Sequence, residues 1–312
     1  MADLMPRDGI FPSDGAILVT GSSGFVGRRL VRRLRANGYR VYETARFDIE
    51  GDGDRLYFDL FDQQSIVRAL DQAKPAAVIH LAAQSSVSGS SSSPLAAWET
   101  NAGGAMNICS AAVEVAAAPA MMFVSSTEVY GRAFNRGVAT ELSSPQPMNP
   151  YARSKLAAEH VFFDTYPSHA PLVIARPANH SGAGQDDRFA LPSFAKQLRD
   201  GSETIKVGNI GVCRDFLHVE DVVDAYVALL QSILACGRGA TFNVASGKSP
   251  TLRQLLERMI ELAGSEARIL VDPERVRLSD IQEAFVDNRK LTTATAWRPK
   301  RSLDELLREL LF

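Results

Sequence analysis

The chain has 312 residues, of which 46% are hydrophobic and 22% charged, so it can bury a large core as one domain or as two unequal ones. Its 34 basic residues nearly balance 36 acidic ones, for a net charge of −2, which argues against nucleic acid or an anionic membrane as the main partner. Only three cysteines occur, with no C-x-x-C pair, so we expect no disulfide framework, no metal site and a location in the reducing cytoplasm.

The N-terminal residues and the first strand come first in chain order. Residues 1–14 carry acids and prolines where a signal peptide needs an apolar run, so we interpret them as a loose leader. No stretch of the sequence approaches the ~20 apolar residues of a membrane helix. The apolar run at 16–20 predicts a strand. It opens an alternation of β-branched runs with amphipathic stretches that is typical of a parallel sheet.

A glycine-rich turn follows this strand directly. The segment TGSSGFVG places Gly21, Gly24 and Gly27 between the strand and a helix predicted at 25–36. Gly21 permits a tight turn, Gly24 lets the backbone approach a pyrophosphate, and Gly27 lets helix and strand pack closely. Unpaired N–H groups at the start of a helix attract an anion. We therefore expect a dinucleotide to bind through the residues of this turn: Gly21, Ser23, Gly24, Phe25, Val26 and Gly27.

The second strand, predicted at 39–45, is followed by the residues that distinguish the two nicotinamide cofactors. A site for NAD needs an acid here to accept from the ribose 2′-hydroxyl, but Arg46 stands at this point and would pair with a 2′-phosphate. Glu43 and Asp48 are close enough to serve as that acid, and Arg46 can equally be a solvated surface charge. We therefore predict NADP(H) as the preferred cofactor, with NAD(H) possible.

The elements from the third strand onward complete a Rossmann-type doubly wound parallel sheet. The third strand, at 55–59, ends in Asp59, which either accepts from the adenine amino group or is a solvated loop acid. The segment 86–95 is rich in serine and glycine, so we expect a mobile loop and a candidate lid. Further strands are predicted at 76–82, 120–126 and 171–177, and helices at 63–73, 94–117 and 150–165.

Three side chains form the predicted catalytic group. Tyr151 and Lys155 are four residues apart, so on a helix they share one face. A tyrosine can donate a proton to a carbonyl if its phenolate is stabilised, and an ammonium one turn away lowers the phenol pKa and can hold ribose hydroxyls. Ser126, at a strand end, can donate to the substrate oxygen. A Y-x-x-x-K pair alone usually marks a surface helix, but with the glycine turn and this serine it favours catalysis.

Glu128, two residues after Ser126, bears on the subclass of the reaction and is included in the predicted catalytic group. A carboxylate there can remove a proton next to a ketone, as a 4,6-dehydratase or an epimerase needs, or it can hydrogen-bond a sugar hydroxyl. A helix or turn cap is the structural alternative. The residues leave these roles open.

The regular alternation of predicted strands and helices ends after residue 178. A glycine-rich loop is followed by further elements: a helix at 190–199, a strand at 204–208, a helix at 221–231, a strand and turn at 241–247, and helices at 251–264 and 302–312. We therefore predict an NAD(P)-binding domain formed by 15–177 and 212–245, and a smaller C-terminal α/β substrate-binding domain formed by 178–211 and 246–312.

The sequence resembles the extended short-chain dehydrogenase/reductase family over nearly the whole chain after residue 15. The likeness is carried by TGSSGFVG, HLAAQSSV, SSTEVYG, YARSK and RDFLHVEDVVDAY. Within that family, ARPANHSGAGQ, FAKQL, KVGNIGVCRDF and TAWRPK look like segments of GDP-4-keto-6-deoxy-D-mannose reductases. The pair Asn179-His180 is more typical of GDP-sugar enzymes than of UDP-glucose epimerases.

The resemblance implies hydride transfer from NAD(P)H to C4 of a GDP-4-keto-6-deoxyhexose, with Ser126, Tyr151 and Lys155 as the triad and a GDP-6-deoxyhexose such as GDP-D-rhamnose as product. It implies further cofactor contacts by Leu60, Leu81, Ala82, Ala83, Gln84, Asn101 and Pro177. It implies contacts to the sugar, diphosphate and nucleoside by Ser86, Ser126, Thr127, Glu128, Asn179, Arg214, Arg277 and Asp280. From the residues alone, Arg214 can equally form a structural ion pair with Asp215.

The sequence also departs from the reductase pattern and leaves alternatives open. Ala178 stands where an aromatic residue is usual, and Ser181 and Ala183 replace an apolar residue and a proline, which bears on the sugar stereochemistry. Thr127 stands where dTDP-glucose dehydratases carry an aspartate, which argues against that subclass. A GDP-mannose 4,6-dehydratase and a nucleotide-sugar 4-epimerase remain. A non-catalytic NAD(P)-binding scaffold or redox sensor is the alternative of another class, although it would not need the triad.

A homodimer is the expected assembly. The alanine-rich segment 107–118 and the predicted helix at 150–165 resemble the surfaces that form four-helix dimer interfaces in the family. Small apolar residues at helical spacing also occur in ordinary cores, so the pattern by itself does not decide between the two.

Overall fold

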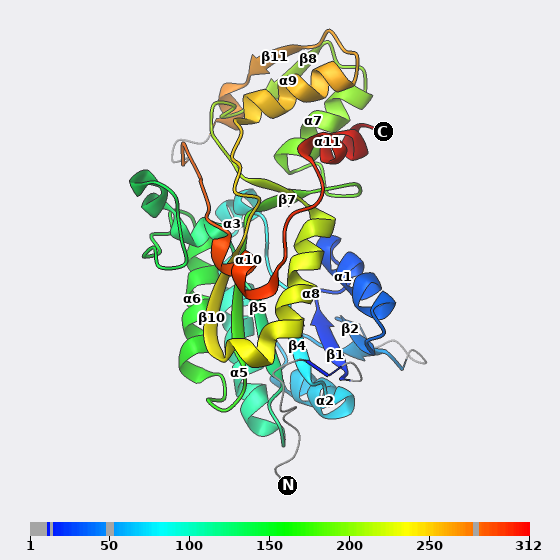
Figure 1. Cartoon of the computed structure of the whole chain (residues 1–312), viewed down its shortest axis with the longest axis vertical. Coiled ribbons are helices and arrows are strands. Elements are labelled where there is room, and N and C mark those ends of the chain that lie inside the picture. The colour runs from blue at the N-terminus through cyan, green and yellow to red at the C-terminus, as the bar shows by residue number, and fades with distance from the viewer. Residues whose placement is uncertain (1–10, 13–14, 48–52, 277–280) are drawn as a thin grey trace.

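The computed structural model describes residues 11–12, 15–47, 53–276 and 281–312, and a parallel sheet with helices on both faces dominates it (Figure 1). The strand order is β10-β6-β5-β4-β1-β2-β3, and each neighbouring pair is parallel. The predicted Rossmann-type doubly wound sheet is confirmed. Its strands are β1 (Ile17–Thr20), β2 (Val41–Ala45), β3 (Arg55–Tyr57), β4 (Ala77–His80), β5 (Ala120–Val124), β6 (Leu172–Pro177) and β10 (Arg238–Val244).

The strand order reverses at β1, which places the ligand-binding edge of the sheet. β1 pairs with β2 on one side and with β4 on the other, so that Ile17 lies opposite both Val41 and Ala77. Open α/β sheets bind ligands outside the carboxyl ends of the strands at such a reversal. All residues of β1 are buried, which explains its nearly unbroken apolar sequence.

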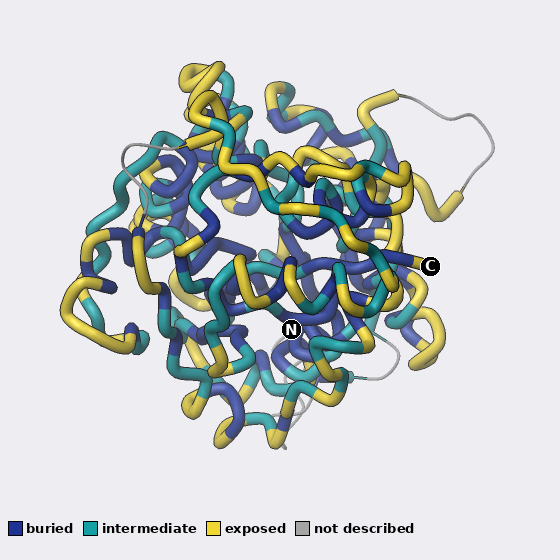
Figure 2. The backbone as a smooth tube through the Cα atoms, turned by 90° about the horizontal axis from the view of Figure 1, so that it is seen from above, coloured by how far each residue is buried: buried dark blue, intermediate teal, exposed yellow. Residues whose placement is uncertain are grey.

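Two layers of helices cover this sheet. The helices are α1 (Phe25–Ala36), α2 (Gln63–Ala73), α5 (Gly104–Glu114), α6 (Pro150–Thr165) and α8 (Val219–Cys236). α1 and α8 pack on one face around Leu30 and Val222, and α2, α5 and α6 pack on the other around Ile66, Ile108 and Phe162. In Figure 2 the buried segments lie mostly in the interior of the molecule, beneath segments that are partly or fully exposed. The sheet therefore separates two apolar cores.

A smaller group of elements lies above the sheet in the view of Figure 1. It contains α7 (Ala190–Arg199), β8 (Thr204–Val207), α9 (Leu252–Leu262), β11 (Arg268–Val271) and α11 (Leu303–Leu311). β8 and β11 pair in parallel, and a separate apolar cluster joins these elements around Leu191, Ile205 and Leu256. Between this group and the sheet, β7 (Asn179–Ser181) pairs with β9 (Phe216–His218).

The chain returns to the large sheet before its last helix. α10 (Arg289–Thr295) packs against α8 and β10, and Leu291 and Trp297 join the core between α8 and the sheet. The Trp297 indole N–H donates to the Asp221 carbonyl at 3.0 Å. The C-terminal residues thus contribute to both parts of the fold.

The serine-rich segment differs from its prediction. The expected loop at 86–95 contains a helix, α3 (Val87–Ser92), and the start of α4 (Pro94–Trp98). The predicted helix at 94–117 is divided into α4, a π-helical turn at Glu99–Gly103 and α5. Local hydrogen bonding explains the helix, because the Ser86 hydroxyl accepts from the Gly89 N–H at 3.1 Å and so caps the first turn.

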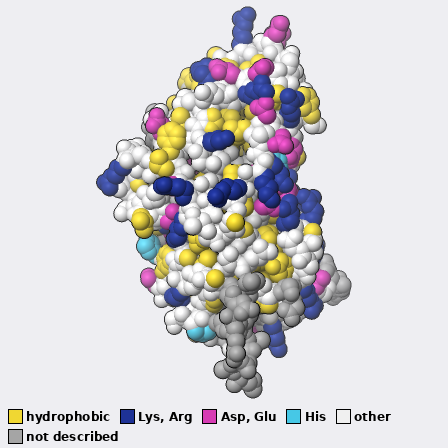
Figure 3. Space-filling model, viewed as in Figure 1, with side chains coloured by type: hydrophobic (Ala, Val, Ile, Leu, Met, Phe, Trp, Pro, Cys, Tyr) yellow, Lys and Arg dark blue, Asp and Glu magenta, His cyan; other side chains and the backbone are white. Residues whose placement is uncertain are grey.

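The described surface carries side chains of both charges. On the face drawn in Figure 3, Lys and Arg side chains occur among Asp and Glu side chains, in agreement with the small net charge. None of the helices in the described ranges combines the length and the apolar composition needed to cross a membrane.

Candidate active site

The turn between β1 and α1 has the shape of a dinucleotide cradle. Gly21 has φ +66°, and a Cβ added to it would lie 2.8 Å from the Ala82 nitrogen. A Cβ on Gly27 would lie 2.1 Å from the Gly21 carbonyl oxygen, so only glycine fits. Gly24 is the N-cap of α1 and provides no side-chain cap, which leaves the first N–H groups of the helix for an anion. These residues fit the diphosphate of a nicotinamide cofactor.

The other turn residues face different neighbours. The Phe25 ring stacks on the His180 ring of β7, with centroids 6.4 Å apart and an interplanar angle of 7°. The Ser23 carbonyl accepts from Arg28 at 2.7 Å, and Val26 packs against the core beneath α1. The contact between Phe25 and His180 therefore joins the cofactor cradle to β7, which lies between the large sheet and the smaller group of elements.

The ends of β2 and β3 carry the residues predicted to recognise the adenosine. Arg46 is exposed, and no described carboxylate pairs with it. Glu43 is engaged elsewhere, because its carboxylate pairs with Arg35 at 3.0 Å and Arg55 at 3.9 Å. Asp48, the other possible ribose acceptor, lies outside the described residues.

Asp59 and Leu60 lie just after β3. One Asp59 carboxylate oxygen accepts from the Phe61 N–H at 2.9 Å, which gives this side chain a structural role in the loop. Leu60 packs against Gly104 at the start of α5, where a Cβ would approach the Leu60 side chain to 3.1 Å. The structure thus places both residues at the carboxyl edge of the sheet.

The segment after β4 closes over the glycine turn. The Ala82 N–H donates to the Thr20 hydroxyl at 3.1 Å, and Leu81 and Ala83 are its neighbours in the chain. Asn101, in the π-helical turn, accepts from the Gln84 N–H at 2.9 Å and donates to the Ser154 hydroxyl at 2.9 Å. Ala82 is therefore held by β1, and Gln84 is linked through Asn101 to α6, which carries the predicted catalytic pair.

Tyr151 and Lys155 lie in the first two turns of α6. Asn149 caps this helix by accepting from the Ala152 N–H at 2.8 Å, and Pro150 occupies its first position. Burial raises the pKa of the Tyr151 phenol to about 12, the Ser126 hydroxyl lowers it, and the Glu128 carboxylate raises it. The net shift is opposite to the lowering expected from Lys155, because burial removes hydration from the phenolate.

Lys155 is held in an apolar environment. Its ammonium lies 4.6 Å from the centre of the Phe123 ring on β5. Burial lowers its pKa to about 7, and Glu159 acts in the opposite direction. His80 lies beside the same ring, and burial, assisted by the charge of Lys155, lowers the pKa of its imidazole to about 3, which keeps it neutral. The pKa of Lys155 is therefore set mainly by burial, which lowers it, and by Glu159, which raises it.

Residues 126–128 follow β5 and lie beside Tyr151. The Ser126 hydroxyl accepts from the Glu128 N–H at 3.1 Å and caps a short 3-10 turn at Thr127–Tyr130. The Thr127 hydroxyl donates to the Pro177 carbonyl at 3.2 Å, so it ties this turn to the end of β6. The Glu128 carboxylate accepts from the Asn149 side chain at 3.1 Å. Glu128 is thus brought beside Tyr151 by the cap of α6.

The predicted nucleotide-sugar residues are only partly described. Arg214 donates to the Ile281 carbonyl at 2.7 Å, while the adjacent Asp215 accepts from the backbone of Ser246 and Gly247 at 2.9 and 2.8 Å. Asn179 is half-buried at the start of β7, and Ser86 caps α3. The predictions for Arg277 and Asp280 lie outside the described residues.

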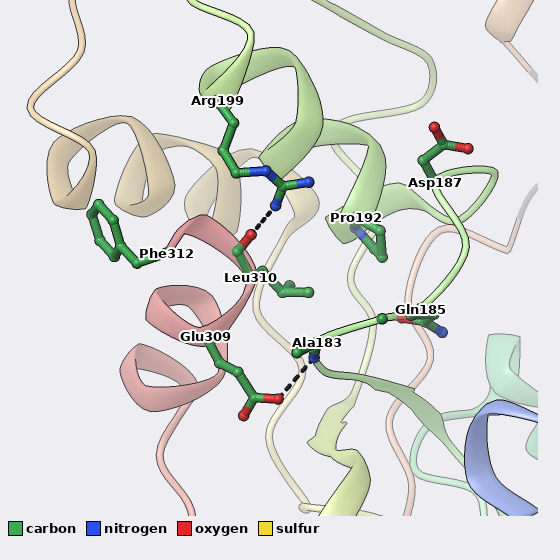
Figure 4. Close-up of a pocket in the computed structure, with 9 residues that line it drawn as sticks. Ala183, Gln185, Asp187, Pro192, Arg199, Glu309, Leu310 and Phe312 are labelled. Carbon is green, nitrogen blue, oxygen red and sulfur yellow. Dashed lines mark hydrogen bonds between the residues drawn. The ribbon is translucent and has the colours of Figure 1, made fainter. Parts of the chain in front are cut away.

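A cavity of about 250 Å³ lies elsewhere, between the loop after β7, α7 and α11 (Figure 4). The polar groups that line it are engaged. The Arg199 guanidinium donates to the Leu310 carbonyl, and Glu309 accepts from the Ala183 N–H at 2.8 Å. The Ala183 carbonyl in turn accepts from Arg29 of α1 at 2.5 Å. None of the residues lining this cavity is a predicted cofactor or substrate residue.

Among the described residues, no group of three or more possible protein ligands is arranged around a metal position.

Several supporting residues were not predicted. Phe123 lies under Lys155, and Thr20 binds the ring of His80 at 2.7 Å. Glu159 on α6 pairs with Arg176 of β6 at 2.6 Å, with both side chains almost fully buried. The four-residue spacing of Tyr151, Lys155 and Glu159 could have indicated that Glu159 lies on the same face of the helix as the predicted catalytic pair. It was not used for a prediction, because an acid in a helix usually faces solvent.

Comparison with known proteins agrees with this architecture. The model of the NAD dependent epimerase/dehydratase family matches residues 17–245. GDP-6-deoxy-D-mannose reductase from Pseudomonas aeruginosa is 33% identical over 302 residues, which cover 95% of each chain. The solved structure of RMD from the same organism, complexed with NADPH, covers 95% of this chain and 97% of its own, with a TM-score of 0.82 and 32% identity.

A solved epimerase has the same overall structure. UDP-glucose 4-epimerase from Thermus thermophilus, in a complex with NAD, covers 95% of this chain and 97% of its own, with a TM-score of 0.82 and 28% identity. Reductases and epimerases therefore both occur among the similar proteins. The chain belongs to the NAD-dependent epimerase/dehydratase family, that is, to the extended short-chain dehydrogenases/reductases, and it is an enzyme of the NAD(P)-dependent oxidoreductase type.

Proposed function

We propose that this enzyme reduces the 4-keto group of a GDP-4-keto-6-deoxyhexose with NAD(P)H and forms a GDP-6-deoxyhexose such as GDP-D-rhamnose. Nucleotide-sugar reductase or epimerase activity in general is supported by the family match and by the named relatives. The more specific proposal depends chiefly on one observation: the Ser126 hydroxyl hydrogen-bonds the Tyr151 phenol and Lys155 follows one turn later on α6, in a chain 33% identical to a GDP-6-deoxy-D-mannose reductase.

The residues of the site have separate roles in this reaction. When bound, the nicotinamide cofactor supplies the hydride that reaches C4. The glycine turn binds the cofactor diphosphate through backbone N–H groups, and Lys155 holds the nicotinamide ribose. Tyr151 donates its phenolic proton to the C4 oxygen, and the Ser126 hydroxyl orients that oxygen. Burial of Tyr151 and Lys155 excludes water from the proton transfer.

NADP(H) is the proposed preferred cofactor. The exposed guanidinium of Arg46 stands at the end of β2, and the nearby acid Glu43 is already paired with Arg35 and Arg55. An arginine in this place suits a 2′-phosphate better than a 2′-hydroxyl. RMD from Pseudomonas aeruginosa was solved with NADPH, which supports the same preference.

A GDP-mannose 4,6-dehydratase or a nucleotide-sugar 4-epimerase is the second candidate function. Glu128 favours it, because this carboxylate lies close enough to Tyr151 to raise its pKa and is aimed by Asn149. Such an enzyme recycles its cofactor, whereas the reductase consumes it. Stoichiometric oxidation of NADPH with the GDP-4-keto sugar, and none with GDP-mannose, is the expected result. Turnover of GDP-mannose without net oxidation would favour the second candidate instead.

The variant Tyr151→Phe tests the catalytic assignment. Loss of the proton donor is expected to reduce kcat about 10²- to 10⁴-fold while cofactor affinity is retained. Tyr166→Phe is the matched control, because it also removes a phenolic hydroxyl. The Tyr166 hydroxyl lies at the other end of α6 and donates to the Pro119 carbonyl. Near-normal turnover by the Tyr151 variant would refute the assignment.

We further propose that segments 15–177 and 212–245 bind NAD(P) and that segments 178–211 and 246–312 bind the substrate. We also propose a cytoplasmic location and a homodimer. The dimer is supported by exposed apolar side chains along α4 and α5, next to α6: Leu95, Trp98, Met106 and Val113. Light scattering at micromolar concentration is expected to give twice the mass of the chain. A monomer mass would refute the proposed dimer.

A further inference from the structure

The row of side chains that carries Tyr151 and Lys155 continues to a buried acid. Tyr151, Lys155 and Glu159 are spaced by four residues on α6, so they follow one line along the helix. Glu159 is only 1% exposed. A carboxylate in that position is costly unless hydrogen bonds and an opposite charge compensate for lost hydration. Its environment therefore indicates whether it has a role besides packing.

Glu159 is fully supplied with donors from the two central strands. Arg176 of β6 donates to it through Nε at 3.0 Å and Nη2 at 2.6 Å, in a bidentate arrangement. The Ser125 hydroxyl, at the end of β5 and next to Ser126, donates to the same carboxylate at 2.5 Å. Three hydrogen bonds replace the hydration that burial removes from the carboxylate. A buried acidic side chain, paired with Arg176, thus lies one helical turn beyond Lys155.

Lys155 has no ion-pair partner among the described carboxylates. Its ammonium rests on the ring of Phe123 at 4.6 Å. His80 beside that ring is neutral, and Glu128 acts on Tyr151. Among the charged groups, Glu159 is the one that opposes the effect of burial on Lys155. The ammonium is therefore stabilised by a carboxylate that it does not touch.

We propose that Glu159, fixed by Arg176 and Ser125, is a positioning residue that keeps Lys155 positively charged so that Lys155 can hold the cofactor ribose and assist Tyr151. This inference depends on the proposed NAD(P)-dependent function of the site. It assigns no direct contact with substrate or cofactor to Glu159.

Binding of NADPH measured against pH, by the fluorescence of the cofactor, tests this proposal without a sugar substrate. The ammonium is protonated below its pKa, so the affinity of the unmodified protein should fall as pH rises through that value. In Glu159→Gln the supporting charge is gone, so the fall should begin about one pH unit lower. Asp164→Asn is the matched control, because it removes the same charge from an exposed position on α6, and its curve should coincide with that of the unmodified protein.

A purely structural role for Glu159 gives a different result. In that case Glu159→Gln would lower the affinity by the same factor at every pH, or leave the curve unchanged, and either result overturns the proposal. If the single variant does not fold, Glu159→Met combined with Arg176→Met removes both charges and fills the space with apolar atoms. A smaller displacement in the same direction is then expected, because the positive charge of Arg176 is removed together with the carboxylate, and coincidence with the unmodified protein overturns the proposal. If the unmodified protein and Glu159→Gln show the expected pH dependence of NADPH binding, but the unmodified protein does not turn over GDP-4-keto sugars, only the proposed substrate is refuted.

Discussion

The Glu159–Arg176 pair allows a quantitative test of how the core around the site is stabilised. Arg176→Met removes one partner and leaves a carboxylate whose side chain is 1% exposed without its two guanidinium hydrogen bonds. Breaking a buried pair from one side costs about 3–5 kcal/mol. With an unfolding entropy of about 2.1 cal/mol/K per residue, a chain of 312 residues loses about 5–8 °C in Tm for that cost.

Replacing both partners by methionine should behave differently. An apolar pair of similar volume has no buried charge left uncompensated, so the double variant should melt close to the unmodified protein or above it. Differential scanning calorimetry of the two single variants and the double variant measures the coupling. Arg188→Met is the matched control, because its pair with Asp186 at 2.6 Å is exposed, and Tm should stay unchanged within error. An Arg176→Met protein that melts normally, or a double variant as unstable as the single ones, would refute this reasoning.

Two further predictions concern cofactor binding. Gly27→Ala should weaken NADPH binding at least ~100-fold in a fluorescence titration, because the new Cβ would lie 2.1 Å from the Gly21 oxygen and force the turn open. Gly211→Ala, where a Cβ meets no atom within 4 Å, should bind normally, and equal affinities for the two variants would contradict the assigned cradle. Arg46→Ser should lower NADPH affinity about 10- to 100-fold through loss of charge-assisted hydrogen bonds, with NADH affinity unchanged. Parallel losses for both cofactors would show that Arg46 does not contact the 2′-phosphate.

The sequence predicted the parts of the site that local rules determine. The glycine turn at Gly21–Gly27 and the cap and spacing of α6 follow from backbone sterics and helical periodicity, so they could be recognised without tertiary contacts. The helix in the serine-rich segment was missed because serine competes with the backbone for hydrogen bonds, and here those bonds cap the helix rather than break it.

Interactions between distant segments could not be predicted in the same way. Arg176 and Glu159 are separated by 17 residues and meet only because β6 and α6 pack together. The pKa of Tyr151 was expected to fall because Lys155 was considered alone, whereas burial dominates in the folded chain. Burial depth is a property of the packed core, and a single sequence does not state it.

The peptide group of Ala183 has a consequence for how distant substitutions act. Its N–H is bound by Glu309 near the end of the chain and its carbonyl by Arg29 in the first helix. The glycine-rich loop that follows β7 is thus anchored at one residue by two side chains, Arg29 and Glu309, that are 280 positions apart in the sequence. A change at Arg29 or at Glu309 removes one of the two hydrogen bonds that hold Ala183, so a substitution in the first or the last helix acts on the same loop.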